Sequence, residues 1–345
     1  MYLFHNDYNE TCLPEIMTAM AATAGQQNPG YGMDPHCEAA AGKIRALCGN
    51  DRLAVHFLVG GTQTNLIVCA AALRPHEAVV CAESGHVFVH ETGAIEATGH
   101  KVVSLPSADG KITALQIESI AAAQRADENA EHNVHGKLVY TSNPTELGTT
   151  YSLQELEDIS RVCKENGMYL YMDGARLGYA LAACDCDVTM ADIARLCDVF
   201  YIGGTKMGAM FGEAVVISAP AIAADFRYLI KQRGGMLAKG WLLGVQFDTM
   251  FEDGLYFKAA AHANRLADRL RSTLANHGYR LFVPGTTNQV FAVLPNGLLE
   301  KLSENFTFMV QERLEDDLSA VRFCTSWGTG EESMDALCAA IDSLS

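Results

Sequence analysis

The sequence predicts an α/β fold in which a mostly parallel sheet carries helices on both faces, followed by a smaller C-terminal α+β domain. Short apolar runs typical of buried strands alternate with helical patterns as far as residue 218. Beyond about residue 240 this alternation gives way to a long helical stretch and a short mixed tail. We therefore expect an N-terminal segment (1–30), a large domain (31–240) and a small domain (241–345).

Composition limits the possible partners. The chain has 345 residues, of which 49% are hydrophobic, enough for a large core. A net charge of −16 argues against nucleic acid and acidic membrane surfaces. Residues 1–12 lack the apolar region of a signal peptide, and no apolar run is long enough to cross a bilayer. Eleven scattered cysteines predict reduced thiols in the cytoplasm, with neither disulfides nor a metal site.

The first 50 residues contain two predicted helices and a turn-rich loop. The helices are expected over Leu13–Thr23 and about Pro35–Cys48. The loop between them, Gln27–Pro35, is either a connector or an ordered functional loop that positions Tyr31.

A Gly-Gly turn follows the next expected strand, Ala54–Val59. The turn and helix start read Gly60-Gly61-Thr62-Gln63-Thr64-Asn65, and the helix is expected to end near Leu73. Free backbone N–H groups and the helix dipole at this point suit a phosphate. Alternatively, Thr62 or Thr64 could simply cap the helix.

A strand at Ala78–Ala82 places His86 at the head of the following segment, with Glu91 five residues further on. A lone histidine is more often a structural hydrogen-bonding group, but an imidazole here could also stack on a planar cofactor. The elements expected next are a strand at Lys101–Leu105, a helix over about Thr113–Arg125 and a loop over Asp127–His135.

The strand Leu138–Ser142 is expected to end at Asn143-Pro144-Thr145-Glu146. A capping box, Ser152-Leu153-Gln154-Glu155, then opens a helix that reaches about Asn166.

Two later strands end in reactive groups. Met168–Met172 leads into Asp173-Gly174-Ala175-Arg176, and Val199–Ile202 leads into a Gly-flanked Lys206. A lysine at a strand end is partly desolvated, which lowers the pKa of its amine and makes it a nucleophile. Lys206 could form a Schiff base with pyridoxal phosphate while Asp173 pairs with the pyridine nitrogen. Either motif alone would suit a surface lysine or a helix-capping aspartate, but the two together favour the cofactor.

The C-terminal third begins with a strand at Ala214–Ser218 and a basic segment around Gly234-Gly235 that carries Arg227, Lys231, Arg233 and Lys239. A helical stretch over about Lys239–Asn276 and a βαβ-like tail should follow; the tail contains Gln289–Leu294, Val321–Ser326 and a helix near Glu331–Leu344. Within this tail, Arg322 either faces solvent on an edge strand or binds a carboxylate.

Together these motifs resemble the threonine aldolase and β-eliminating lyase group of fold-type-I pyridoxal-phosphate enzymes, and most closely its phenylserine-aldolase-like branch. The motifs are Asn6-Asp7, Tyr31-Gly32-x-Asp34-Pro35, Gly61-Thr62-Gln63-x-Asn65, His86 with Glu91, Asp173-Gly174-Ala175-Arg176, Thr205-Lys206 and Val321-Arg322-Phe323. The resemblance covers nearly the whole chain and implies a seven-stranded, mostly parallel sheet.

The resemblance also implies a role for each site residue. Lys206 bonds the cofactor, Asp173 pairs with its pyridine nitrogen and Arg176 binds its ring hydroxyl. The remaining roles are phosphate binding by Gly61, Thr62 and Gln63, ring stacking by His86, and substrate binding by Asn6, Arg322, Tyr31 and Thr145. Lys206, His86 and Asp173 are the expected catalytic residues.

Three positions depart from the family pattern. Asn6 replaces a serine, Leu237 replaces an arginine, and Thr145 replaces a histidine that contacts the substrate's β-hydroxyl in many members. Because Thr145 does not titrate and is small, we expect weak activity on threonine and better activity on a bulkier substrate such as phenylserine. Glu146 could supply a carboxylate, but the next residue along a strand end usually points elsewhere.

The expected function is a pyridoxal-phosphate-dependent aldolase that cleaves a β-hydroxy-α-amino acid to glycine and an aldehyde. The alternatives are a β-eliminating lyase or aminotransferase with the same cofactor, and a non-catalytic nucleotide-binding α/β protein. The resemblance further implies a homodimer or homotetramer with active sites between subunits.

Overall fold

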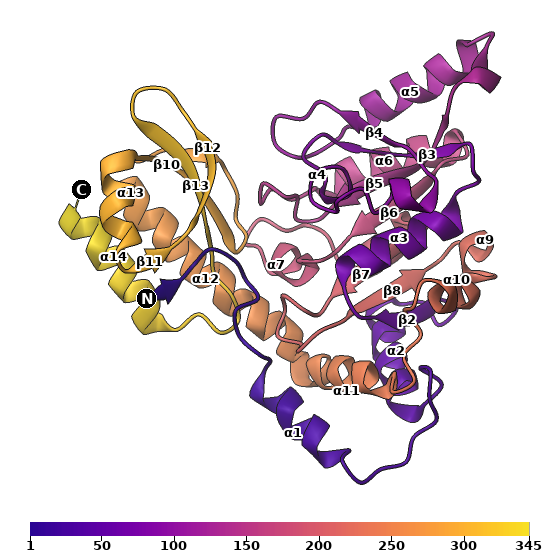
Figure 1. The fold of residues 1–345 in the computed structure, drawn as a ribbon, viewed down its shortest axis with the longest axis horizontal. Coiled ribbons are helices and arrows are strands. Elements are labelled where there is room, and N and C mark those ends of the chain that lie inside the picture. The colour runs from indigo at the N-terminus through magenta and orange to yellow at the C-terminus, as the bar shows by residue number, and fades with distance from the viewer. Residues whose placement is uncertain (345) are drawn as a thin grey trace.

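The computed structural model describes residues 1–344, which form a large domain around a seven-stranded sheet and a small domain around a four-stranded sheet (Figure 1). The large-domain strands are β2 (Ala54–Leu58), β3 (Glu77–Ala82), β4 (Val102–Leu105), β5 (His135–Ser142), β6 (Tyr169–Asp173), β7 (Val199–Gly203) and β8 (Glu213–Ile217). The helices up to residue 250 are α1 (Pro14–Ala22), α2 (Pro35–Cys48), α3 (Gly61–Ala72), α4 (His86–Val89), α5 (Ala114–Ala126), α6 (Leu153–Glu165), α7 (Leu177–Leu181), α8 (Met190–Leu196), α9 (Pro220–Ala223), α10 (Phe226–Gln232) and α11 (Trp241–Met250).

The large sheet has the strand order β2-β8-β7-β6-β5-β3-β4. Every neighbouring pair is parallel except the two pairs that involve β8, which runs antiparallel to both β7 and β2. The other six strands therefore share one direction, and their carboxyl ends lie along a single edge. The predicted seven-stranded, mostly parallel sheet is confirmed.

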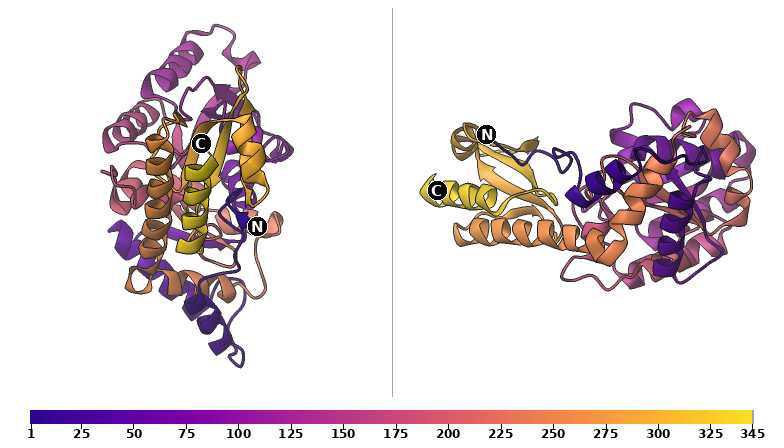
Figure 2. Two further views of the ribbon diagram at one scale, coloured as in Figure 1. Left: turned by 90° about the vertical axis from the view of Figure 1, so that its left-hand side faces the viewer. Right: turned by 90° about the horizontal axis from the view of Figure 1, so that it is seen from below.

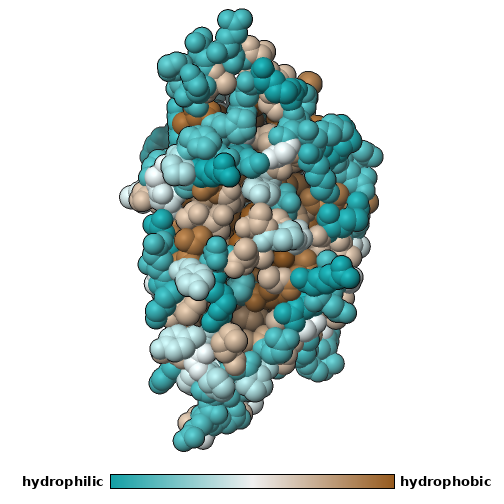
Figure 3. Space-filling model, turned by 90° about the vertical axis from the view of Figure 1, so that its right-hand side faces the viewer, coloured by the Kyte–Doolittle hydropathy of each residue, from teal (hydrophilic) through white to brown (hydrophobic). Residues whose placement is uncertain are grey.

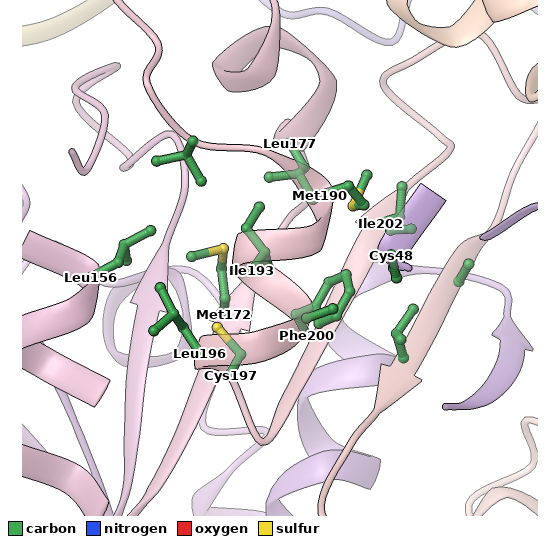
Figure 4. Packing of buried hydrophobic residues seen from close by; sticks show 14 of the residues in the cluster. Cys48, Leu156, Met172, Leu177, Met190, Ile193, Leu196, Cys197, Phe200 and Ile202 are labelled. Atoms are coloured by element: carbon green, nitrogen blue, oxygen red, sulfur yellow. The ribbon is translucent and has the colours of Figure 1, made fainter. Parts of the chain in front are cut away.

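Apolar clusters cover both faces of this sheet, as the alternation of side chains along each strand requires. On β7, Phe200 and Ile202 join the cluster beneath α2, α6 and α8, whereas Val199 and Tyr201 join the opposite cluster beneath α3, α9 and α10. Figure 4 shows Phe200 near Ile193 of α8 and Ile202 beside Met190 of the same helix. Both faces are thus closed to water, and only the strand ends remain for chemistry.

The small domain is built on an antiparallel sheet with the order β12-β13-β10-β9. Its elements are α12 (Leu255–Asn276), β9 (Leu281–Val283), β10 (Gln289–Pro295), α13 (Asn296–Ser303), β11 (Phe306–Thr307), β12 (Met309–Arg313), β13 (Leu318–Cys324) and α14 (Glu331–Leu344). The expected βαβ-like tail is therefore wrong in its strand direction. The β12–β13 hairpin turns the chain back, so that β13 runs antiparallel to β10.

The helical stretch expected over 239–276 is two helices. Asp253 and Gly254 both have positive φ (48° and 68°), and these residues separate α11 from α12. α11 packs on α2 of the large domain, where Gly244 lies against the backbone of Cys37. The domain boundary expected at residue 241 stays a prediction; α11 lies against the large domain, and α12 begins after Gly254. From there α12 runs along the small domain (Figure 2, right).

The N-terminal segment connects the two domains. β1 (Tyr2–Leu3) pairs in parallel with β11 of the small domain, and α1 packs on α11 beside the large domain. Between them, the Leu13 N–H donates to the carbonyl oxygen of Gly208, just beyond the Lys206 turn (2.8 Å). Residues 4–13 consequently pass between the domains, along the edge where the large-domain strands end.

Gly174 should tolerate no side chain. A Cβ at this position would collide with the carbonyl oxygen of Tyr201 on the neighbouring strand, and the backbone of β7 cannot retreat without breaking its pairing. We expect Gly174→Ala to lower the free energy of unfolding by about 3 kcal/mol or more, as severe overpacking does. Urea unfolding measures this.

The control is Gly42→Ala in α2, where no neighbouring atom lies within 4 Å of an added Cβ. That change should be neutral or stabilise by about 0.5–1 kcal/mol, because alanine favours helix interiors. Equal effects of the two substitutions would contradict the steric explanation.

Candidate active site

A cavity of about 350 Å³ lies at the carboxyl edge of the large sheet. Side chains that follow β2, β3, β5, β6 and β7 line it, together with the first residue of β8. The lining includes Tyr8, Gly60, Gly61, Thr62, Asn65, His86, Pro144, Glu146, Asp173, Arg176, Thr205, Lys206, Phe211 and Glu213. Residues far apart in sequence meet here because the parallel strands end at one edge.

Lys206 lies in the turn after β7. Its carbonyl oxygen accepts a hydrogen bond from the Tyr179 hydroxyl (2.6 Å), which fixes the backbone beneath the side chain. Within residues 1–344, Lys206 Nζ forms neither a hydrogen bond nor an ion pair. Burial and the Arg176 guanidinium lower the pKa of Lys206, partly opposed by nearby carboxylates. The structure thus holds in the cavity an amine that has a lowered pKa and no hydrogen-bond or ion-pair partner among the described residues.

Asp173, the last residue of β6, is held by four donors. Its Oδ1 accepts from the Tyr201 hydroxyl (2.5 Å) and the Ala175 N–H (3.0 Å). Its Oδ2 accepts from the Tyr140 hydroxyl (2.6 Å) and Asn65 Nδ2 (3.3 Å). A carboxylate with this many donors has a fixed orientation and is suited to pairing with a cationic ring nitrogen.

A second hydrogen-bonded chain leads from Asn65 to His86. Asn65 Nδ2 also donates to Glu91 Oε1 (2.6 Å), which lies 2.8 Å from His86 Nδ1. The Tyr171 hydroxyl in turn donates to Asn65 Oδ1 (2.6 Å). His86 is thereby held through Nδ1, with its ring in the cavity wall. Sequence reasoning paired His86 with Glu91 but missed the tyrosines.

Arg176 forms a buried, two-pronged ion pair with Asp7. Nε and Nη2 donate to the two carboxylate oxygens at 2.6 and 3.0 Å, and Asn288 Nδ2 adds a third bond to Asp7 (2.9 Å). Burial alone would raise the pKa of Asp7, but the charges of Arg176 and Lys206 lower it below its usual value. Arg176 still lines the cavity, although Asp7 occupies much of its donor capacity.

Glu213 was missed in the sequence because it is the first residue of a strand that reads as purely apolar. It pairs across β7–β8 with Gly203, which brings its carboxylate beside the Lys206 turn. Thr205 Oγ1 donates to Oε1 (2.9 Å) and the Gly204 N–H donates to Oε2 (3.0 Å). Burial raises the pKa of Glu213 to about 8, although the Lys206 charge acts in the opposite direction.

The start of α3 supports the interpretation of the Gly-Gly turn as an anion site. No side chain caps this helix, so the capping alternative for Thr62 and Thr64 is not what the structure shows. Thr64 Oγ1 instead bonds back to the carbonyl of Gly60 (3.1 Å). The first N–H groups of a 12-residue helix therefore lack side-chain partners at the cavity wall.

Five expected site residues do not line this cavity, namely Thr145, which is described below, and the four described here. Asn6 uses its side-chain oxygen to accept from the Tyr8 N–H (3.0 Å). Gln63 bonds the carbonyl of Arg233 (3.5 Å). Tyr31 is half exposed and borders a separate cavity of about 180 Å³. Arg322 bonds the carbonyl of His5 (3.1 Å), but its buried Nε has no partner.

The expectation for Thr145 and Glu146 is reversed. Thr145 is almost fully buried, and its hydroxyl bonds Thr149 Oγ1 (2.7 Å) and the carbonyl of Asp109 (3.3 Å), away from the cavity. Glu146 lines the cavity instead. Side-chain alternation stops at Ser142, where β5 ends, because the chain enters a turn closed by bonds between Thr145 and Thr149. The expected placement of Thr145 at the substrate is therefore wrong, whereas the expected preference for phenylserine over threonine stays a prediction.

Comparison with known proteins identifies the family. The sequence profile described as Beta-eliminating lyase matches residues 7–296. The chain belongs to the beta-eliminating lyase family. It is 33% identical to a low specificity L-threonine aldolase from Pseudomonas sp. (strain NCIMB 10558), over 97% of this chain and 95% of that protein. A low specificity L-threonine aldolase from Saccharomyces cerevisiae is 26% identical, over 83% and 72%.

Solved structures agree with this assignment. A structure of Leishmania major threonine aldolase superposes with a TM-score of 0.97 at 48% identity, covering 100% of this chain and 99% of that one. Aspartate aminotransferase from Thermus thermophilus shares the fold alone (TM-score 0.69, 16% identity, coverage 100% and 92%). The fold is thus fold type I, and the chain is a lyase of a pyridoxal-phosphate enzyme family.

Residues 1–344 contain neither a candidate membrane span nor a metal-binding cluster. None of their helices combines the length and apolar character needed to cross a membrane. Within the same residues, no group of three or more histidine, cysteine, aspartate or glutamate side chains is arranged to hold a metal ion.

Glu213 should make stability depend on pH. The pKa of Glu213 is raised from 4.5 to about 8 in the fold, so its stabilising contribution is present below pH 4.5 and is lost as the pH rises through about 8. Between these values, wild type should lose stability relative to Glu213→Gln. The expected loss is about 1.4 kcal/mol for each tenfold difference between the acid dissociation constants of the folded and unfolded states.

The measurement is urea unfolding of cofactor-free wild type and Glu213→Gln at about pH 5 and about pH 8.5. Replacing one acceptor oxygen also changes the free energy of unfolding, but by an amount that does not depend on pH. Only the change in their difference is diagnostic, and a difference that stays constant across this range would contradict the buried-acid assignment.

Proposed function

We propose that this chain cleaves a β-hydroxy-α-amino acid of the threonine or phenylserine type to glycine and an aldehyde, with pyridoxal phosphate as its cofactor. The observation that carries the proposal is that one cavity contains both the Lys206 amine, which has no bonding partner among the described residues, and the Asp173 carboxylate, which four donors hold. Relatives that share nearly the whole chain length carry the name L-threonine aldolase.

The residues present suit this cofactor. Lys206 would bond its aldehyde carbon and Asp173 its pyridine nitrogen. The uncapped start of α3, with Gly61 and Thr62, would hold the phosphate. The remaining contacts are His86 against the ring and Arg176 near the ring hydroxyl. Bound there, the cofactor supplies an electron sink for the bond that breaks at Cα.

The chain's own task is to grip and orient the substrate. Arg322 offers a buried Nε without a partner, an unmet donor of the kind that a substrate carboxylate would satisfy. Holding that carboxylate fixes the direction of the Cα–Cβ bond, which is worth a large rate factor in itself. Asn6 remains a proposed neighbour of the carboxylate, although its side chain serves a local turn in this structure.

The alternative reactions are β-elimination and amino-group transfer. Aminotransferases among the structural neighbours are under 25% identical and bear only on the fold. Product analysis separates the three: glycine plus aldehyde, ammonia plus a keto acid, or a transferred amine. Comparing kcat/KM for threonine and phenylserine identifies the preferred β-substituent. Tyr8 and Phe211 in the cavity wall would suit an aromatic ring.

The cellular setting also belongs to this proposal. Eight of the eleven cysteines are buried as free thiols, which supports a reducing compartment such as the cytoplasm.

Lys206→Ala should abolish turnover by several orders of magnitude, because a covalent step is lost. It should also remove the visible absorbance of the bound cofactor that wild type shows. Absorbance spectra and product assays of the purified proteins measure both effects. Lys258→Ala, which removes an exposed lysine of α12, is the control. A Lys206→Ala protein with full activity and an unchanged spectrum would contradict the role of Lys206 as the residue that bonds the cofactor.

We further propose a twofold assembly in which the Tyr31 loop of one subunit completes the site of another. Tyr31 has φ +65°, lies 48% exposed and stacks under Lys231 Nζ (5.1 Å to the ring centre). This ordered aromatic and basic group lines no part of the Lys206 cavity of its own chain. Figure 3 shows apolar residues gathered in the middle of one face with a hydrophilic rim, as at many subunit interfaces.

Mixing two inactive variants tests this assembly. Lys206→Ala keeps an intact Tyr31 loop, and Tyr31→Ala keeps an intact Lys206. After unfolding and refolding together, mixed dimers would contain one complete site, so about a quarter of wild-type activity should return by random assortment. Either variant refolded alone is the control. A fully active monomer in sedimentation at assay concentration would exclude the model.

A further inference from the structure

Glu146 is an acidic side chain of the cavity to which the proposed function gives no task. It lies in the turn after β5, and it lines the cavity together with Lys206 and Asp173. Asp173 is committed to its four donors, and Glu213 is held by the Lys206 turn itself. A carboxyl group beyond those two is available for the substrate.

The contacts of Glu146 fix one of its oxygens. Oε1 accepts from the Ser142 hydroxyl (2.7 Å) and from the backbone N–H of His86 (2.8 Å). Neither donor contacts Oε2. No arginine, lysine or histidine of residues 1–344 forms an ion pair with Glu146. The carboxyl group is therefore held in one orientation, and no cationic side chain of the described residues forms an ion pair with it.

The surroundings of Glu146 favour proton exchange. Burial raises its pKa; the Ser142 hydrogen bond lowers it, and the negative charge of Asp173 raises it further. The other titratable groups close enough to sense its charge are Tyr140 on β5, Cys81 on β3 and Tyr151; His86 on α4 contacts it through the backbone. A buried carboxyl with a raised pKa in a cavity is a candidate general acid or base.

We propose that Glu146 is the catalytic base for the substrate's β-hydroxyl group, an inference that rests on the proposed aldolase function. Glu146 takes the hydroxyl proton while the Cα–Cβ bond breaks. The oxygen's electron pair forms the aldehyde C=O bond, and the electron pair of the broken bond stays with the Cα fragment. That fragment takes up one proton and leaves as glycine, and Glu146 returns its own proton to solvent.

Neighbouring groups suit this task less well. The Thr145 hydroxyl is buried away from the cavity and does not titrate near neutral pH. His86 lines the cavity, but Glu91 holds its Nδ1, and its ring is the group placed to stack on the cofactor. Among these neighbours, Glu146 is thus the titrating side chain that remains to act on the substrate, since its two donors bond only Oε1.

The test compares Glu146→Gln with wild type on two reactions of the holoenzyme. Gln keeps an oxygen for the Ser142 and His86 donors but cannot take a proton. Cleavage of threonine and of phenylserine should fall by about 100-fold or more. Exchange of the glycine α-hydrogen with D₂O, followed by NMR, needs no β-hydroxyl base and should stay within about threefold of wild type.

Two further readouts separate a chemical role from a structural one. Glycine affinity, measured by titrating the visible absorbance, should change by no more than about twofold in Glu146→Gln. The wild-type cleavage rate should rise with pH as the carboxyl group loses its proton, and the variant should lose this rise. Glu146→Asp should keep the pH dependence at a reduced rate, and Glu165→Gln on the exposed end of α6 is the matched control.

Each outcome decides the matter. Cleavage by Glu146→Gln at the wild-type rate, or with the wild-type pH profile, would overturn the proposal. Loss of glycine exchange or glycine affinity along with cleavage would also overturn it, because Glu146 would then be structural. A wild type that forms no glycine from either substrate would instead contradict the proposed function itself.

Discussion

The buried ion pair between Asp7 and Arg176 is the interaction on which the geometry of the site depends. Asp7 comes from the N-terminal segment and Arg176 from the start of α7, and Asn288 reaches Asp7 from the small domain. Three parts of the molecule therefore meet at one carboxylate. Removing one partner of such a pair typically costs about 3–5 kcal/mol, because the other is left buried and charged. The pair thus stabilises one relative placement of the segments that border the cavity.

That ion pair also shapes the electrostatics of Lys206. Arg176 lowers the pKa of the lysine, while Asp7 acts in the opposite direction. Because the two charges act on the amine in opposite directions, they offset each other in part, and burial is the largest cause of the lowered pKa. The cavity then sorts its acids by their surroundings: Asp173 among four donors, and Glu213 and Glu146 with pKa values raised by burial. One short edge thereby places carboxyl groups in unlike surroundings, which suits them to different roles.

Much of the site could be predicted from sequence because parallel strands impose a common edge. Once Lys206, Asp173 and His86 were each placed after a buried strand, their meeting followed from topology. Sequence motifs predicted the structure correctly where it depends on hydrogen bonds between neighbouring residues. The capping box at Ser152 is an example, since the structure contains both of its hydrogen bonds. The Thr145 prediction failed where a period-two rule was carried past the end of β5, into a turn with its own hydrogen bonds.

The residues that sequence reasoning missed act through strand pairing. Tyr140 and Tyr201 lie on the two strands that flank Asp173 on β6, and each reads as an ordinary apolar strand residue until the register places its hydroxyl on the carboxylate. Glu213 is the clearest case. It reaches the Lys206 turn only because β8 runs against the direction of its neighbours, so that its first residue, rather than its last, lies at the carboxyl edge. A one-residue shift of that pairing would place Ala214 opposite Gly203 and leave the Gly204 N–H and the Thr205 hydroxyl without their carboxylate.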